Sequence, residues 1–389
     1  MADARRLHGA ALVEALRESR ARSWSLVDDL TDAQWQMPEQ RGVNPVRWEL
    51  AHLAWFAEFW VLRGPHHRAA DGTARAWQPA LHAGPDELFD SARLAHAARW
   101  RTPMPSRGQL VEMLQGQLAA CVKALPASDD DAANYFHRLA LFHEDMHAEA
   151  FAWLRAALGY EAPARLTLAP LAQAAPVVLR GGEFQLGRRT DEAGFVFDNE
   201  GPRCSATLRD FEIDATTVSA GRFLRFVEAG GYENPAYWPG AAGEWRARSD
   251  KPHPQRWRFD KATGWQTRWF DRWLPLDPDQ PVIHVNAFEA EAYCLWAKRR
   301  LPSAAEWERA AEYIQWGHSV WEWTADAFQP YPGFTPGPYR EYSAPWFGDH
   351  RELRGGAFAT HARMHDPRYR NFFQPQRSDV FAGFRSVAL

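Results

Sequence analysis

The chain has 389 residues, of which 46% are hydrophobic and 24% charged, a composition typical of globular proteins rather than disordered ones. Its 45 Lys and Arg residues face 49 Asp and Glu residues, and the net charge of -4 excludes a basic surface for nucleic acid or acidic membranes. No apolar run approaches the roughly 20 residues that span a bilayer, and no apolar segment follows the first residues as in a secretory signal. We therefore expect a cytoplasmic protein of two or three domains, acting as a monomer, without nucleic-acid or membrane partners.

The cysteines and aromatic residues narrow the class of protein further. Cys121, Cys204 and Cys294 are widely spaced and form no CxxC pair, so neither a disulfide framework nor a zinc ribbon is predicted. The chain holds 20 Trp, 23 Phe and 10 Tyr residues. We expect most of the tryptophans in hydrophobic cores, although indole rings also line pockets for cations and sugars.

The first 158 residues carry helical patterns, with apolar residues recurring at spacings of three and four. Helices are predicted at residues 5–27, 44–62, 107–125 and 130–158, with Asn44 and Ser106 as candidate N-caps. Four such helices predict a bundle. Residues 64–105 are rich in His, Pro and Arg, and we interpret them as a long irregular connection that carries function.

The sequence changes character after residue 158. Residues 159–178 contain three prolines and no clear period, and we interpret them as a linker. The rest of the chain is rich in Gly, Pro and Trp with short β-prone runs, which indicates an α+β domain of short strands and long ordered loops. Helices are expected within it at residues 219–229, 287–300 and 303–314.

The clearest chemical motif lies in the fourth predicted helix, where His143 and His147 are four residues apart. This spacing places both imidazoles on one helix face, one turn apart, within reach of a single metal ion. The segment also fits the HExxH pattern of zinc proteases, in which Glu144 would be the general base. Two unrelated surface histidines are the simpler alternative.

A third histidine, His52, lies in the middle of the second predicted helix among apolar neighbours. Ligands from facing helices converge in the core of a bundle, so His52 is a candidate third ligand. A buried histidine is more often satisfied within the core than bound to a metal. Spacing alone leaves both alternatives open.

Short motifs follow one another along nearly the whole chain. They include WELAH at 48–52, LFDS at 88–91, HEDMH at 143–147, FDNE at 197–200, VWEWT at 320–324 and YRNFF at 369–373. With these motifs the chain resembles the ergothioneine-synthase-like family of non-haem iron sulfoxide synthases. The resemblance implies an α+β protein of two domains. Residues 1–158 would form a DinB-like four-helix bundle, and residues 179–389 a formylglycine-generating-enzyme-like (sulfatase-modifying factor) domain with a C-type-lectin-like fold.

The resemblance also implies roles for single residues. His52, His143 and His147 would hold Fe(II) and leave positions open for substrate and O2. The implied substrate is hercynine, the betaine of histidine, whose trimethylammonium group would lie between the domains against Asn371 and Phe372. Formylglycine-generating enzymes bind copper through a C-terminal cysteine pair, and since no cysteine follows Cys294 we do not expect that activity.

Departures from the family's motifs concern the second substrate. Met146 stands where the sulfoxide synthases usually carry Gln, and Ala92 and Arg93 stand where one branch has two tyrosines. Phe373 stands where enzymes that use γ-glutamylcysteine have an Asp for the donor's ammonium, and its apolar ring favours a neutral, hydroxyl-rich donor. Residues 143–159 are most similar to the selenoneine-synthase branch, which joins hercynine to a selenosugar. We therefore predict Fe(II)- and O2-dependent formation of a C–Se bond.

Further candidates and alternatives remain open at this point. One of Tyr331, Tyr339 and Tyr342 is the candidate proton donor, and all three have structural roles as the alternative. Candidate donor-binding residues besides Phe373 and Met146 are Arg93, Arg99, Arg101 and Arg377. The competing functions are a hercynine sulfoxide synthase with a thiol donor, a zinc- or nickel-dependent DinB-type thiol transferase or hydrolase, and a non-catalytic sugar-binding protein.

Overall fold

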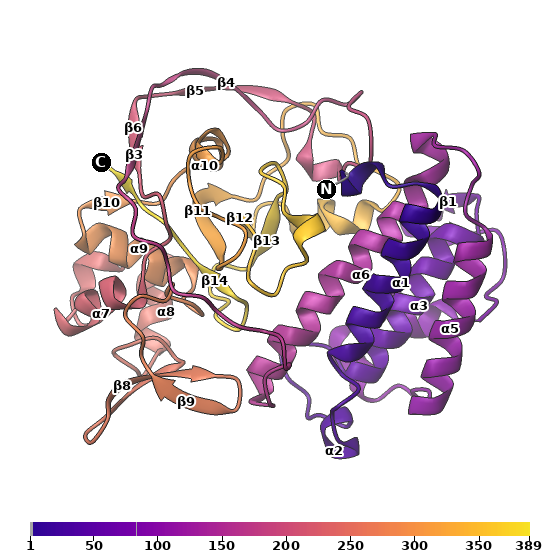
Figure 1. Ribbon diagram of the computed structural model, residues 1–389, viewed down its shortest axis with the longest axis horizontal. Helices are drawn as coiled ribbons and strands as arrows, with labels where there is room; N and C mark the ends of the chain where they lie inside the picture. Colours follow the sequence, from indigo (N-terminus) through magenta and orange to yellow (C-terminus); the bar gives the residue numbers. More distant parts are fainter. Residues whose placement is uncertain (1–2, 83) are drawn as a thin grey trace. The chain divides into compact units, whose positions relative to one another are not determined.

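The protein, seen as a computed structural model that describes residues 3–82 and 84–389, divides into two compact units. The first unit comprises Met1–Leu154 with Ala193–Val196, and the second comprises Arg155–Glu192 with Phe197–Leu389. Long helices dominate the first unit, and short strands with long loops dominate the second (Figure 1). This confirms the predicted α+β class with a helical N-terminal part. The predicted linker at 159–178 stays a prediction.

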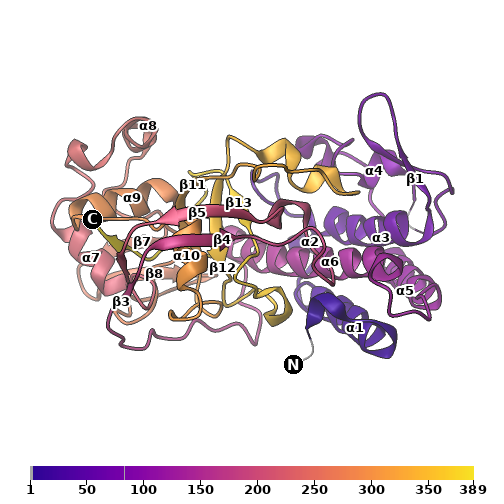
Figure 2. The ribbon, with the colours of Figure 1, turned by 90° about the horizontal axis from the view of Figure 1, so that it is seen from above.

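Four long helices form the helical unit and lie side by side in both views (Figures 1 and 2). They are α1 (Gly9–Ser25), α3 (Val46–Leu62), α5 (Arg107–Lys123) and α6 (Asp131–Leu158). Shorter elements connect them: α2 (Asp32–Trp35), β1 (His66–Arg68), β2 (Ala74–Ala76), α4 (Asp86–Phe89) and the 3-10 segments Ala4–Arg6 and His96–Trp100. The predicted bundle is therefore confirmed.

Of the two predicted helix N-caps, one is confirmed and the other is wrong. Ser106 caps α5 as predicted, since its hydroxyl accepts from the backbone N–H of Gln109, whose side chain in turn accepts from the N–H of Ser106. The prediction of Asn44 as the cap of α3 was wrong, because Pro45 holds that position without a side-chain cap. The amide oxygen of Asn44 instead accepts a hydrogen bond from Arg99 at 2.6 Å.

The connection between α3 and α5 is more ordered than its composition indicates. Strands β1 and β2 form an antiparallel hairpin, and Arg63 forms an ion pair of 2.6 Å with Asp86 at the start of α4. The buried carboxylate of Glu58 accepts from the backbone N–H groups of Leu81 and His82 at 2.9 and 2.7 Å. The side chain of Glu58 in α3 thus holds this connection by accepting hydrogen bonds from its backbone N–H groups.

Short strands in several small sheets form the second unit. One sheet has the order β13-β12-β11-β14, and another has the order β10-β15-β6-β3. The strands are β3 (Val177–Leu179), β4 (Gly182–Leu186), β5 (Cys204–Leu208), β6 (Phe211–Ile213), β7 (Trp257–Asp260), β8 (Gly264–Trp269), β9 (Arg272–Pro275), β10 (Arg299–Arg300), β11 (Trp321–Ala327), β12 (Arg351–Gly355), β13 (Asn371–Phe373), β14 (Ala382–Gly383) and β15 (Val387–Ala388). The helices are α7 (Ala220–Glu228), α8 (Ala241–Arg248), α9 (Ala287–Trp296) and α10 (Ala304–Ala310).

Two predicted helices of this unit extend too far. The helix expected to reach residue 300 ends at Trp296, because Lys298 adopts a φ of 54° and the chain then enters strand β10. The helix expected at 303–314 begins at Ala304, after the cap Ser303, and ends at Ala310.

A buried network of charges holds strand β13 in place. Glu352 of β12 is only 1% exposed and accepts from Arg354 at 2.7 Å and from Arg370 at 2.6 Å. Burial alone raises the pKa of the Glu352 carboxyl, but the two arginine charges outweigh burial, so the pKa is lowered. Since Arg370 directly precedes β13, this network fixes the position of Asn371 and Phe372.

We expect Glu352→Ala to lower the free energy of unfolding by about 3–5 kcal/mol, because it leaves two buried guanidinium groups without their shared carboxylate. Chemical denaturation followed by tryptophan fluorescence measures this loss. The exposed Glu233→Ala serves as control and should change stability by no more than about 0.5 kcal/mol. Equal stability of the two variants would show that the network contributes nothing.

Candidate metal centre

Three imidazoles meet inside the helical unit. His52 comes from α3, and His143 and His147 come from α6. One ring nitrogen of each lies within 4.8 Å of the others, and the Nε2 atoms of His52 and His143 are 3.3 Å apart. His52 and His143 are buried, and His147 is half-buried. The structure thus brings the three predicted ligands together, while their role as metal ligands stays a prediction.

Hydrogen bonds to the outer nitrogens orient two of these rings. Nδ1 of His52 lies 2.7 Å from the carbonyl oxygen of Phe89, and Nδ1 of His147 lies 2.5 Å from the carboxylate of Glu49. Because both partners are acceptors, each Nδ1 carries the proton and each Nε2 carries a lone pair. This is the arrangement of histidine ligands whose outer nitrogen is held by a second residue.

The electrostatics of the site favour neutral imidazoles. Burial lowers the pKa of His52 and of His143 well below the usual value for histidine, and the charge of His147 acts in the same direction. A metal ion binds the neutral form, so no proton has to be displaced from these two rings near pH 7. Three neutral nitrogen donors fit Fe(II) or Zn(II) and leave coordination positions open.

Aromatic rings fix the planes of two ligands. His143 stacks on Phe56 with the ring centroids 3.5 Å apart, and His52 stacks on Trp48 at 4.9 Å. The guanidinium of Arg99 lies 3.9 Å from the centroid of the Trp48 ring. These contacts restrict ring rotation, so the nitrogens keep their direction toward one another.

Glu144 does not have the environment of a general base. Its carboxylate is buried and accepts from Arg20 of α1 at 2.6 and 3.1 Å. Arg20 also donates to the carbonyl of Leu114 and to Gln117 of α5. Glu144 is therefore committed to joining α1, α5 and α6, and this disfavours the protease alternative.

The candidate donor-binding residues of this unit are in different environments. Arg93 forms an ion pair with Glu87 at 2.9 Å, and the 76% exposed side chain of Arg101 lies 3.5 Å from Glu39. Met146 is half-buried on α6. Arg99 differs from the other two arginines, because it contacts Trp48 next to a candidate metal ligand.

In the second unit, Asn371, Phe372 and Phe373 form strand β13 and pair with β12. All three are half-buried. Phe372 stacks on Phe328 with centroids 4.2 Å apart. The guanidinium of Arg377 lies 5.2 Å from the centroid of Phe373.

The three candidate tyrosines differ in what they contact. Tyr342 lies with its ring centroid 5.7 Å from that of Phe372, and its hydroxyl is 2.9 Å from that of Tyr369. Burial raises the pKa of Tyr342 well above its usual value. The hydroxyl of Tyr331 instead accepts from Arg354 within the buried charge network, and Tyr339 contacts Tyr342 with centroids 6.1 Å apart. Tyr342 is thus the candidate that adjoins the predicted hercynine residues.

Glu49, Phe56 and Phe89 support the histidines but were not predicted from the sequence. A usable signal existed for Glu49, because a carboxylate in the middle of an apolar helix needs a partner. The carbonyl of Phe89 carries no such signal, since any residue supplies one.

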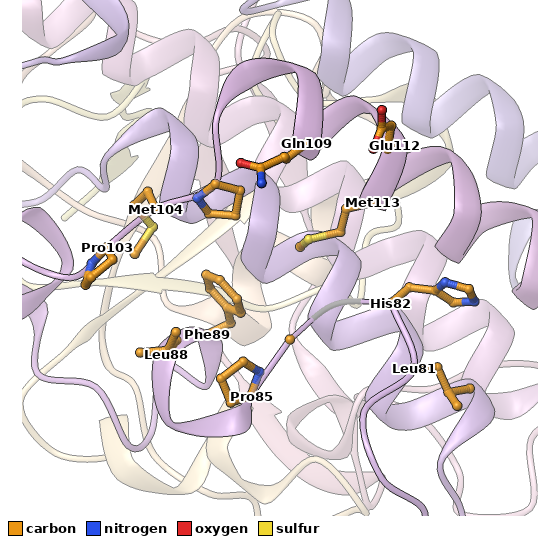
Figure 3. Close-up of a pocket in the computed structure, with 12 residues that line it drawn as sticks. Leu81, His82, Pro85, Leu88, Phe89, Pro103, Met104, Gln109, Glu112 and Met113 are labelled. Atoms are coloured by element: carbon orange, nitrogen blue, oxygen red, sulfur yellow. The ribbon is translucent and has the colours of Figure 1, made fainter.

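A pocket of about 670 Å3 borders the same region (Figure 3). Its walls include the apolar side chains of Leu88, Phe89, Met104 and Met113 together with the polar side chains of His82, Gln109 and Glu112. Phe89 is both a wall of this pocket and the carbonyl partner of His52. None of the three histidines lines it.

Comparisons with known proteins assign the family. The DinB superfamily matches residues 15–157, and the sulfatase-modifying factor enzyme 1-like domain matches residues 167–319 and 314–388. Hercynine oxygenase of Mycolicibacterium thermoresistibile is 30% identical, over 97% of this chain and 94% of its own. The chain belongs to the ergothioneine-synthase-like family. Another member, hercynine oxygenase of Mycobacterium tuberculosis, is 29% identical over 95% of this chain and 96% of its own.

The second unit alone has relatives of another kind. Formylglycine-generating enzyme of Streptomyces coelicolor is 27% identical over 48% of this chain and 79% of its own. Among the described residues, no helix combines the length and the hydropathy that crossing a membrane requires. The cytoplasmic location and the monomeric state stay predictions.

We expect Glu49→Ala to weaken divalent-metal binding roughly 10–100-fold, because His147 loses the carboxylate that orients it. Titration of the metal-free protein with Co(II), followed by the visible absorbance of the bound ion, measures both affinity and geometry. Glu49→Gln keeps an acceptor without the charge and should lie between the two.

Glu58→Ala is the matched control, since Glu58 is another buried acid of α3 but holds a loop rather than a histidine. Its metal affinity should stay near that of the unmodified protein. A similar loss in both variants would mean that Glu49 acts only through the stability of the bundle.

Proposed function

We propose that this protein couples hercynine oxidatively to a selenosugar in a reaction that requires Fe(II) and O2. The observation that carries the proposal is the set of three converging imidazoles, two of them buried, in a chain whose full-length relatives are named hercynine oxygenases. His52, His143 and His147 would hold the iron, with Glu49 and Phe89 orienting two of them. The bound iron would supply the activation of O2.

The reaction balances without a further reductant. The C–H bond of the hercynine imidazole and the Se–H bond of the donor break, and one C–Se bond forms. O2 accepts four electrons in total. One of its oxygen atoms leaves as water, and the other stays on selenium.

The aromatic surroundings of Phe372 support the recognition of hercynine. A trimethylammonium group donates no hydrogen bond and is attracted to aromatic faces. Phe372 lies among Phe328, Tyr342 and His350, with ring centroids 4.2 to 5.9 Å away. Tyr342, which adjoins Phe372, is the proposed proton donor.

The surroundings of Phe373 support a neutral donor. The charged group over its ring is Arg377, which forms a two-point ion pair with Asp379 at 2.7 and 2.5 Å. Asp379 is therefore already neutralised. An ammonium buried here would lose hydration without gaining a countercharge, whereas a sugar can stack a C–H face on the ring.

We expect turnover with a selenosugar, and slow turnover with γ-glutamylcysteine, when the Fe(II)-loaded protein meets hercynine and O2. Mass spectrometry of the coupled products in parallel reactions measures this preference. Phe373→Asp should shift the preference toward γ-glutamylcysteine, because it supplies the missing countercharge. Phe259→Asp places the same charge on an exposed phenylalanine and should not shift it.

Faster turnover of γ-glutamylcysteine by the unmodified protein would assign the thiol as donor and refute the selenosugar. Turnover of a thiol that persists without O2 and with zinc would instead favour a DinB-type transferase.

A further inference from the structure

A second, smaller pocket of the helical unit is lined by positively charged side chains. It encloses about 240 Å3 near the start of α3, and its walls include Trp35, Met37, Arg47, Arg99, Trp100 and Met104. Two of these residues are arginines, and none of the described lining residues is an acid. The larger pocket, by contrast, carries Glu112 and no arginine.

The two arginines are held differently. Arg99 is anchored by Asn44 at 2.6 Å and by the ring of Trp48. The half-buried side chain of Arg47 forms neither a hydrogen bond nor an ion pair with any residue in the described part of the chain, and its Nε atom is buried. The buried Nε of Arg47 therefore lacks the acceptor that such a donor normally finds in a protein.

The side chain of Trp100 also has a buried donor without an acceptor. Its indole Nε1 is buried and has no acceptor among residues 3–82 and 84–389. Trp35 differs, because its indole N–H donates to the carbonyl of Val27 at 3.1 Å. A buried donor without an acceptor destabilises the folded protein, so two of them around one pocket need an explanation.

We propose that this pocket binds a small ligand that bears an oxyanion, a phosphate or a carboxylate group. Arg47 pairs with the oxyanion, Trp100 donates through Nε1, and the faces of Trp35 and Trp100 cover the ligand's apolar part. The fork of a guanidinium matches both groups in two-point geometry. The volume lies below the roughly 300–1000 Å3 of pockets for drug-sized molecules, which limits the ligand to about the size of a single sugar.

None of the metal-ligand candidates lines the pocket, although Arg99, a candidate donor-binding residue, does. The oxyanion site rests on Arg47 and Trp100, which are not assigned to the proposed reaction. Arg99 nevertheless connects it to the metal centre, because Arg99 lies on Trp48 and Trp48 stacks on His52. An oxyanion beside Arg99 would lower the local positive charge near the iron-binding residues.

Isothermal titration of the full-length protein with inorganic phosphate, glucose 6-phosphate, glutamate and glucose tests the proposal. We expect saturable binding of at least one oxyanion, weaker at high salt, and no binding of glucose. Tightest binding of inorganic phosphate would identify a free anion, of glucose 6-phosphate a sugar phosphate, and of glutamate a carboxylate. Each of these three results supports the oxyanion site.

Variants distinguish oxyanion binding in this pocket from a general effect of the protein's positive charge. Arg47→Met should weaken oxyanion binding at least tenfold, Arg47→Lys should weaken it less, and Trp100→Phe should weaken it while keeping the ring face. Arg41→Met removes the same charge from an exposed residue outside the pocket and should leave binding unchanged. Absence of oxyanion binding in the folded protein, equal affinities of Arg47→Met and Arg41→Met, or equal binding of glucose would overturn the proposal.

Discussion

The helical unit depends on one constraint: two buried imidazoles and one half-buried imidazole converge, and each must keep its inward nitrogen unprotonated. Burial of His52 and His143 keeps them neutral, and acceptors on the outer nitrogens of His52 and His147 fix which nitrogen faces inward. Neighbouring residues of the bundle hold the imidazoles in these orientations. Glu49 lies on the same helix as His52 but holds His147 of α6, whereas the carbonyl of Phe89 in α4 holds His52.

The second unit is held in place by buried ion pairs. Its strands are short and contribute few ladder hydrogen bonds, so buried ion pairs such as Glu352 with Arg354 and Arg370 hold them in register. Breaking such a pair is costly because it leaves a buried charge uncompensated. A short strand anchored in this way presents Asn371 and Phe372 on a rigid support, which suits recognition of a cation by an aromatic face.

Features that depend on the local spacing of residues could be predicted from the sequence alone. The pair at 143 and 147 follows from the helical period, and the bundle follows from four amphipathic segments. Contacts between distant residues could not be predicted from the sequence. Glu49 and His147 lie 98 positions apart, and no local pattern shows that Asn44 contacts Arg99 instead of capping α3. The end of α9 depends on the left-handed conformation of Lys298, a residue type that gives no such signal. The three-stranded sheet β7-β8-β9 and helix α8 were also not predicted.

The central claim is that His52, His143 and His147 bind one iron ion. Anaerobic addition of Fe(II) to the metal-free protein, followed by X-ray absorption at the iron edge, tests it most directly. The account predicts one tightly bound iron per chain with three imidazole nitrogens at roughly 2.0–2.2 Å, and loss of this signature in His52→Ala. An unchanged iron spectrum in that variant, or ligation dominated by sulfur, would contradict the account.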